Sequence, residues 1–145
     1  MKKAVFPGSF DPFTSGHEAI VQRGLELFDT ICIAIGVNTD KHYMFSPEQR
    51  LEKVQQLYAH EPRIDVLTYS DMTVELCRRV GAHFILRGIR NANDLAYEQT
   101  VAAVNRSLDP TIDTVILLSD IEYQDISSTL ERERLAHQKE TSHQQ

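Results

Sequence analysis

The sequence predicts an α/β fold, in which a Rossmann-like, doubly wound sheet of five parallel strands carries helices on both faces. Five short apolar runs rich in β-branched residues show little polar alternation, as expected of strands covered on both faces. Four longer segments between them repeat apolar residues every three or four positions, which is typical of amphipathic helices. Strands that alternate with helices in this way favour a parallel sheet with right-handed crossovers.

Three strands and two helices are expected in the first half of the chain. The run "KAVF" predicts a strand at 3–6, "TICIAIGV" a strand at 30–37 and "IDVLTY" a strand at 64–69. Apolar residues at helical spacing predict a helix at 17–28. The helix at 46–59 has the clearest start, because "SPEQ" supplies a capping serine, a proline at the first helical position and a glutamine that can close a capping box.

The second half is expected to continue the alternation. Helical periodicity predicts a helix at 71–81, the run "HFILR" a strand at 83–87, and "DTVILLS" a strand at 113–119. The helix expected between these strands, at 93–108, carries an apolar stripe that should pack against the sheet or a neighbouring subunit. A last helix is expected to begin near Ser127.

Composition restricts the class of protein. The 145 residues, 41% of them apolar, suit one soluble domain, expected at 1–137 and followed by a polar, frayed tail at 138–145. A net charge of −6 without a Lys/Arg cluster argues against a nucleic-acid partner, so a small molecule is the expected partner. No apolar run is long enough for a membrane span or a signal peptide, which favours the cytoplasm and no membrane partner. Cys32 and Cys77 lack metal or redox spacing and are interpreted as buried thiols.

The stretch "PGSFDPFTSGH", directly after the first expected strand, has the features of a phosphate-binding loop. In a doubly wound sheet, ligands bind beyond the carboxyl ends of the strands, where such loops lead into helices. Gly8 and Gly16 allow close backbone approach, and Thr14 or Ser15 can cap a helix whose free amides attract an anion. His17 then lies in the first turn, where it can donate a hydrogen bond to a phosphate. The loop is neither a Walker A motif nor G-x-G-x-x-G.

Three motifs in order resemble one family. The end of "PGSFDPFTSGH" is similar to the T/S-x-G-H signature of nucleotidyltransferases, and "YQDISSTLER" resembles their I-S-S-T-x-x-R signature. With "LRGIR" between them, the spacing resembles that of the bacterial phosphopantetheine adenylyltransferases, from Ala4 to about Arg132. The resemblance implies transfer of the adenylyl group of ATP to 4′-phosphopantetheine, giving dephospho-coenzyme A and pyrophosphate in coenzyme A biosynthesis. It also implies direct in-line attack without a covalent enzyme intermediate, Mg²⁺ that enters with ATP, and a homohexamer.

The resemblance also implies roles for single residues. His17 matches a histidine that stabilises the transition state, and Ser9 a hydroxyl that contacts both ATP and the substrate phosphate. Lys41 matches a lysine that draws in the substrate phosphate, Arg87 a second substrate contact and Arg90 a contact of the ATP phosphates. The catalytic set is therefore His17, Ser9, Lys41 and Arg90, and no residue is assigned to a metal. The remaining matches are Thr73 on the pantetheine arm, and Phe10, Gly88, Ile89, Glu98, Tyr123, Gln124, Asp125, Ile126, Ser127, Ser128 and Thr129 on ATP.

Other interpretations stay open at this point. Arg87 and Arg90 can pair on the surface with Asp94 and Glu98, which would be worth under about 1 kcal/mol. The acceptor can instead be nicotinamide mononucleotide, or glycerol phosphate with a cytidine donor, although Lys41 and "LRGIR" favour phosphopantetheine. A non-catalytic nucleotide-binding module is the third possibility. Two departures from the family are the short polar tail and the negative charge of Asp125 beside the expected polyphosphate.

Overall fold

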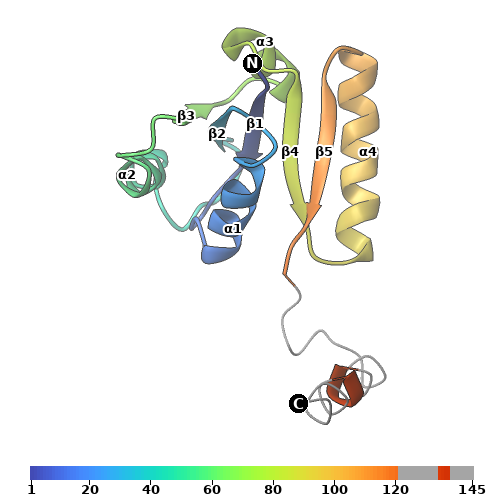
Figure 1. The fold of residues 1–145 in the computed structure, drawn as a ribbon. Coiled ribbons are helices and arrows are strands. Elements are labelled where there is room, and N and C mark those ends of the chain that lie inside the picture. The colour runs from blue at the N-terminus through green and yellow to red at the C-terminus, as the bar shows by residue number, and fades with distance from the viewer. Residues whose placement is uncertain (121–133, 138–145) are drawn as a thin grey trace.

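The computed structural model describes residues 1–120 and 134–137 of the chain. Within these residues, five strands form one parallel sheet in the order β3-β2-β1-β4-β5 (Figure 1). The predicted α/β class and doubly wound topology are confirmed. The strands are β1 (Lys3–Gly8), β2 (Thr30–Gly36), β3 (Ile64–Tyr69), β4 (Phe84–Ile89) and β5 (Asp113–Leu118).

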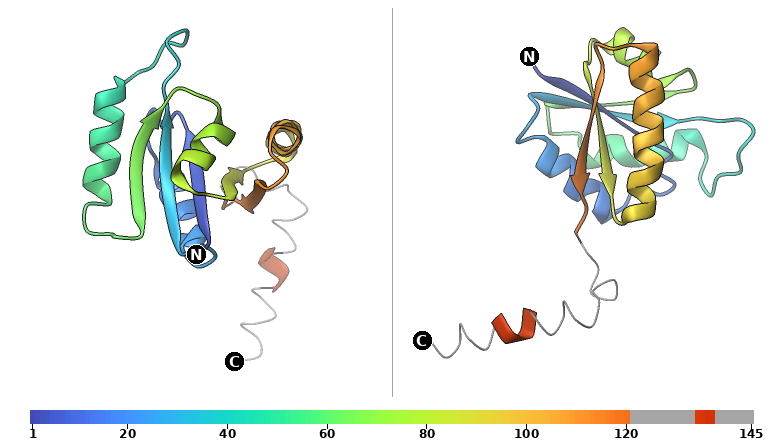
Figure 2. Two further views of the ribbon diagram at one scale, coloured as in Figure 1. Left: turned by 90° about the horizontal axis from the view of Figure 1, so that it is seen from above. Right: turned by 90° about the vertical axis from the view of Figure 1, so that its right-hand side faces the viewer.

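Helices connect successive strands and cover both faces of the sheet (Figure 2). They are α1 (Ser15–Gly24), α2 (Pro47–Leu57), α3 (Thr73–Val80) and α4 (Ala92–Leu108). The first two pack on one face and the last two on the other, because the chain moves outward from β1 to β3, then returns to β4 and moves outward again. None of the helices in the described residues has the length and apolar character that crossing a membrane requires.

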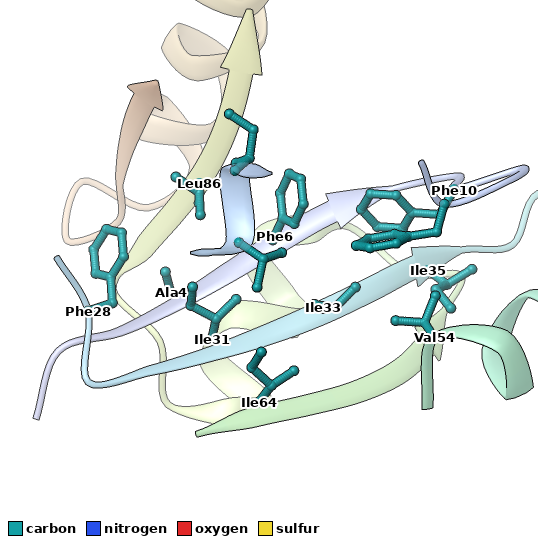
Figure 3. Close-up of a cluster of buried hydrophobic side chains, with 13 residues drawn as sticks. Ala4, Phe6, Phe10, Phe28, Ile31, Ile33, Ile35, Val54, Ile64 and Leu86 are labelled. Carbon is teal, nitrogen blue, oxygen red and sulfur yellow. The ribbon is translucent and has the colours of Figure 1, made fainter. Parts of the chain in front are cut away.

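Alternate residues of the central strands build a core on each face. On one face, Phe6 and Ile33 pack with Val21 of α1 and Val54 of α2 (Figure 3). On the other face, apolar residues of β1, β2 and β4 pack against α3; both cysteines, Cys32 and Cys77, lie in this second core. Burial raises the pKa of each thiol to about 11, so both are unreactive buried thiols, as expected from the sequence.

Several boundaries differ from the predicted ones, and tertiary packing explains two of them. The first helix ends at Gly24 rather than at residue 28. Gly24 approaches the sheet so closely that a Cβ added to it would lie 2.7 Å from a methyl carbon of Leu86. The fourth strand continues to Ile89, which pairs with Leu118 of β5, so Gly88 and Ile89 end a strand and do not form a turn. The expected helix start near Ser127 and the tail at 138–145 lie outside the described residues.

The other helix ends follow local chemistry. The predicted capping box of α2 is present, since Gln49 N–H donates to Ser46 Oγ (3.1 Å) and Ser46 N–H to Gln49 Oε1 (2.9 Å). Helix α3 ends before Gly81, whose φ of 74° lies in the left-handed region that glycine adopts without strain.

β1 and β4, the neighbours at the centre of the sheet, separate toward their carboxyl ends. β1 pairs with β2 along its whole length, from Lys3 to Gly8. All residues of β1 and β4 are described, and these two strands pair only at Ala4 with Phe84 and at Val5 with Ile85. Pro7 comes after this ladder has stopped, where its missing N–H costs no hydrogen bond. The sheet therefore opens between β1 and β4, at the switch point where α/β proteins bind ligands.

Candidate functional site

A cavity of about 910 Å³ lies at this opening. It extends from the carboxyl ends of β1, β2 and β3 along β4 and β5, where α4 also lines it. All four residues that the sequence assigned to the acceptor substrate line this cavity: Ser9, Lys41, Thr73 and Arg87. Ser9 follows β1, Lys41 follows β2, Thr73 begins the helix after β3, and Arg87 lies in β4. The topology thus gathers residues that are distant in the chain around one hollow.

His17 closes the amino end of α1. The amide of Thr14, the residue that caps the helix, donates to His17 Nδ1 at 2.9 Å, and the His17 amide faces Thr14 Oγ1 at 3.4 Å. Because an amide N–H only donates, Nδ1 must carry a lone pair, and the neutral ring holds its proton on Nε2. The cap therefore selects the tautomer and leaves Nε2–H as the donor available to a ligand.

Burial and neighbouring cations keep the ring of His17 neutral. Burial lowers its pKa below 6.5, and the positive charges of Arg87 and Arg90 lower it further. The rings that surround it have centroids 5.0–6.3 Å from its own and belong to Phe6, Phe10 and Phe13. At neutral pH the site therefore combines an uncharged donor with two guanidinium groups within electrostatic range.

Arg87 is held rigidly at the wall of the cavity. Its Nε and Nη2 donate to the carboxylate of Glu98 (3.0 and 2.7 Å), and its Nη1 donates to the carbonyl of Pro7 across the opening between β1 and β4. These contacts use three of its five N–H groups, so two remain for a ligand. The suggestion of a surface pair was wrong for Arg87, because Glu98 is only 5% exposed.

Of the other described residues assigned to ATP, only Glu98 lines the cavity. Arg90 is exposed and forms a surface ion pair with Asp94, whose Oδ2 lies 3.6 Å from Nε and accepts a hydrogen bond from the Arg90 amide at 2.9 Å. Phe10 is buried over Gly8, where an added Cβ would lie 2.8 Å from its ring, so only the backbone of Phe10 can meet a ligand. Gly88 packs against Ile20 of α1 at a distance of 3.0 Å for an added Cβ.

Ile89 is also buried, and its carbonyl accepts a hydrogen bond from the Ser119 amide (2.8 Å). Glu98 does line the cavity, but its carboxylate is occupied by Arg87. The seven residues assigned between 123 and 129 lie outside the described part of the chain.

The sequence analysis missed several polar residues at the site. Tyr69 lines the cavity, and its hydroxyl lies 3.1 Å from Thr73 Oγ1. Arg50, which is 2% exposed, lies behind the cavity wall and holds the carbonyl of Ser9. The signal for Arg50 was available, because it falls four residues before Val54 on the buried stripe of α2.

Comparison with known proteins gives strong sequence matches. The family model described as cytidylyltransferase-like matches residues 5–134. A protein of Flavobacterium johnsoniae named phosphopantetheine adenylyltransferase is 49% identical over 137 residues, which cover 94% of this chain and 90% of the relative. Proteins of the same name from Porphyromonas gingivalis and Bacteroides fragilis are 47% and 44% identical, each covering 98% of this chain and 94% of the relative.

Solved structures with a similar fold are more distant in sequence. A lipopolysaccharide core biosynthesis protein from Thermoplasma volcanium matches with a TM-score of 0.60 at 18% identity, over 84% of this chain and 98% of that one. A bifunctional NMN adenylyltransferase/ADP ribose pyrophosphatase from Francisella tularensis, complexed with AMP and a manganese ion, gives 0.61 at 18% identity, over 84% of this chain and 38% of that one. At this identity the likeness establishes the fold alone.

Proposed function

The chain belongs to the phosphopantetheine adenylyltransferase family, and from that premise we propose that it transfers the adenylyl group of ATP to 4′-phosphopantetheine. The products are dephospho-coenzyme A and pyrophosphate, in a step of coenzyme A biosynthesis. One observation carries the proposal beyond the family name: Ser9, Lys41, Thr73 and Arg87 line a single cavity. A hydroxyl and two cations in one hollow suit a phosphate monoester that carries an extended polar arm.

The proposed reaction is a direct displacement at the α-phosphorus of ATP. An oxygen of the acceptor phosphate forms the new bond to phosphorus, while the bond to the bridging oxygen breaks and pyrophosphate leaves. Such transfers need positioning and charge stabilisation rather than an enzyme nucleophile. Lys41, Ser9 and Arg87 hold the acceptor phosphate in this scheme, and the Nε2–H of His17 donates to the phosphoryl oxygens as charge develops there.

ATP occupies the remaining part of the site in this proposal. Its phosphates lie over the first turn of α1, where backbone amides and the positive end of the helix dipole favour an anion. Arg90 adds a cation, and the backbone of Phe10, Gly88 and Ile89 borders the nucleotide. Tyr123, Gln124, Asp125, Ile126 and the hydroxyls of Ser127, Ser128 and Thr129 are proposed to wrap it.

Mg²⁺ is proposed to enter as part of the nucleotide substrate. Two carboxylates line the cavity, and both already have arginine partners: Glu98 binds Arg87, and Asp71 binds Arg79 at 2.6 Å. The described residues contain no group of three or more potential metal ligands. This donor set suits a cation held by phosphates and water rather than by a protein cage. When bound, Mg²⁺ would neutralise part of the negative charge of the polyphosphate.

We further propose one catalytic domain over 1–137, assembled as a homohexamer in the cytoplasm. Exposed apolar residues on α4 outside the cavity lining, Val104 and Leu108, support assembly. The buried surface of this helix, by contrast, is contributed by Glu98. Sedimentation velocity of the purified protein tests the oligomeric state.

A product assay tests the activity. The protein is incubated with Mg-ATP and 4′-phosphopantetheine, and in parallel with nicotinamide mononucleotide, or with glycerol phosphate and CTP, and products are identified by mass. Dephospho-coenzyme A formed together with pyrophosphate is the expected result. Turnover of another acceptor, or nucleotide binding without any transfer, would contradict the proposal.

A further inference from the structure

Arg50 is a buried charged side chain that the reaction scheme above does not use. It extends from α2 and makes three hydrogen bonds, all to backbone carbonyls. Nη1 donates to Ser9 (2.7 Å) and Gly36 (3.0 Å), and Nε donates to Phe45 (3.2 Å). Two of these carbonyl residues, Ser9 and Gly36, also line the large cavity.

Among residues 1–120 and 134–137, the charge of Arg50 has no carboxylate partner. In the described part of the chain, no Asp or Glu oxygen lies within 4.0 Å of its guanidinium, which instead covers the ring of Tyr43 at 4.0 Å. Its Nη2 is buried without a hydrogen-bond partner. Burying a cation is costly unless an opposite charge compensates it. Packing alone would be served at lower cost by an apolar side chain of similar length, so the guanidinium needs another explanation.

The three carbonyls identify what the guanidinium joins. Ser9 belongs to the loop after β1, Gly36 ends β2, and Phe45 closes the loop that carries Lys41. One rigid, planar group thus fixes the loop that bears the Ser9 hydroxyl against the loop that bears the Lys41 ammonium.

Further contacts tie the Lys41 loop, residues 37–46, to the same group. The amide of Asn38 donates to the hydroxyl of Tyr43 (3.0 Å), whose ring lies under the guanidinium. The carboxylate of Asp11 accepts from the amides of Met44 (2.6 Å) and Phe45 (2.8 Å). The loop is therefore anchored to Arg50 and to the loop after β1, while Lys41 itself is exposed to the cavity.

We propose that Arg50 is a positioning residue for the acceptor phosphate, and this inference rests on the proposed function. It sets the distance between the Ser9 hydroxyl and the Lys41 ammonium so that both contact one phosphate group. Its uncompensated charge lies behind the carbonyl of Ser9, where a dianion in the cavity lowers the electrostatic cost of burying it. The ligand class is a phosphate monoester, and the effect of Arg50 is specific to the phosphate rather than to the arm.

Arg50→Met and Arg50→Lys test this proposal by calorimetric binding of 4′-phosphopantetheine and of pantetheine, which lacks the phosphate. The phosphate ratio, defined as the Kd of pantetheine divided by the Kd of 4′-phosphopantetheine, measures what the phosphate contributes to binding. Methionine keeps most of the volume and removes the charge and all three hydrogen bonds, so we expect the ratio to fall at least about tenfold. Lysine keeps the charge, but its donors lie on one atom and cannot reproduce the spacing between Nε and Nη1, so an intermediate ratio is expected. The KM for ATP should stay within about twofold of the wild type.

Two control variants separate positioning from damage to the fold and from net charge. Val54→Ala removes buried volume one turn further along α2, and Arg63→Met removes a positive charge from an exposed pair before β3. Both should leave the phosphate ratio unchanged. If Arg50→Met does not fold, Arg50→Lys alone decides. Equal loss of affinity for both ligands, or a ratio unchanged in the soluble variant, would overturn the role of Arg50.

The same experiment distinguishes this inference from the proposed function. A wild-type protein that makes no dephospho-coenzyme A contradicts the function. Inorganic phosphate binding still tests Arg50 in that case, because the subsite recognises a phosphate whatever it is attached to. Weaker phosphate binding in both Arg50 variants supports the inference, and unchanged phosphate binding overturns it.

Discussion

Replacing His17 by glutamine and by alanine separates the two tasks that the structure gives this residue. His17 completes the cap of α1 through Nδ1, and its Nε2–H remains for the ligand. Glutamine at the same helical position is a standard capping-box partner, and Gln49 plays that part for Ser46 in α2. His17→Gln should therefore keep the cap and lose the imidazole donor, whereas His17→Ala should lose both.

The expected magnitudes follow from the contacts. The lost cap is worth about 1 kcal/mol, and each lost ring contact with a phenylalanine about 0.5–1.5 kcal/mol. With three such ring contacts, we expect His17→Ala to destabilise the fold by about 2.5–5.5 kcal/mol. His17→Gln should destabilise it by about 1 kcal/mol less, because only the ring contacts are lost. That gap corresponds to about 3–4 °C in Tm for a domain of this size. Turnover should fall by about 10²–10³ in both variants, with ATP affinity within several-fold of the wild type.

Urea unfolding and steady-state turnover measure the two effects on the same preparations. Equal unfolding midpoints for the two variants would show that the cap contributes nothing to stability. Turnover retained in His17→Gln or His17→Ala would remove the imidazole from the chemistry. Either result refutes one half of the reasoning without touching the other.

Acid provides a second test of the capped imidazole. Protonation places a hydrogen on Nδ1, opposite the amide of Thr14, and the pKa of His17 in the folded state is already lowered by burial and by Arg87 and Arg90. Between that lowered pKa and 6.5, the unfolded chain binds more protons than the folded one, so stability falls as the pH drops through this window. The fall should be smaller in His17→Gln, and an identical pH profile would contradict the assignment.

Three further predictions concern packing and charge. Gly8→Ala should destabilise the fold by about 1–3 kcal/mol, because the new Cβ would lie 2.8 Å from the buried ring of Phe10. Gly16→Ala should keep the Tm but raise the KM for ATP, because its Cβ would meet only the hydroxyl of Thr14, at 3.5 Å. The opposite order of Tm values would contradict this. Glu98→Gln should cost about 1–3 kcal/mol in urea and raise the KM for the acceptor, since its arginine partner loses a buried counter-charge; an unchanged KM would show that the pair is structural only. Cys32 and Cys77 have pKa values of about 11, so about one thiol in a thousand is ionised at pH 8. Iodoacetamide should therefore label them only after unfolding. Rapid labelling of the folded protein would contradict their burial.

Local patterns were sufficient to predict the order and type of the elements. Each apolar run and each helical stripe lies largely within one element, so neither depends strongly on distant residues. The cap formed by Ser46 and Gln49 could be predicted for the same reason. Thr14 was one of two expected caps of α1, but the capping box itself was missed, because histidine is not the usual partner at that position.

The remaining features depend on contacts between distant parts of the chain. The end of α1 is set by the approach of Gly24 to Leu86, and the end of β4 by its pairing with β5. The partner of Arg87 lies eleven residues away on another element, and Arg50 reaches Ser9 across forty-one residues. Sequence motifs identified part of the cavity lining, and Asp94 and Glu98 were named as possible partners of Arg87 and Arg90. The motifs did not predict that the Arg87 pair is buried or that backbone carbonyls hold Arg50.

The separation of β1 from β4 also determines how the cavity can deform. Along β1 and β2, six paired residues make the wall stiff. Across the opening, the two halves of the sheet are joined beyond Val5 by side chains: Arg87 reaches Pro7 on the cavity face, and Ile20 of α1 packs on Gly88 on the opposite face. We therefore expect the width of the cavity to be its most compliant dimension, because a small rotation about α1 would leave the paired residues of β1 and β2 intact.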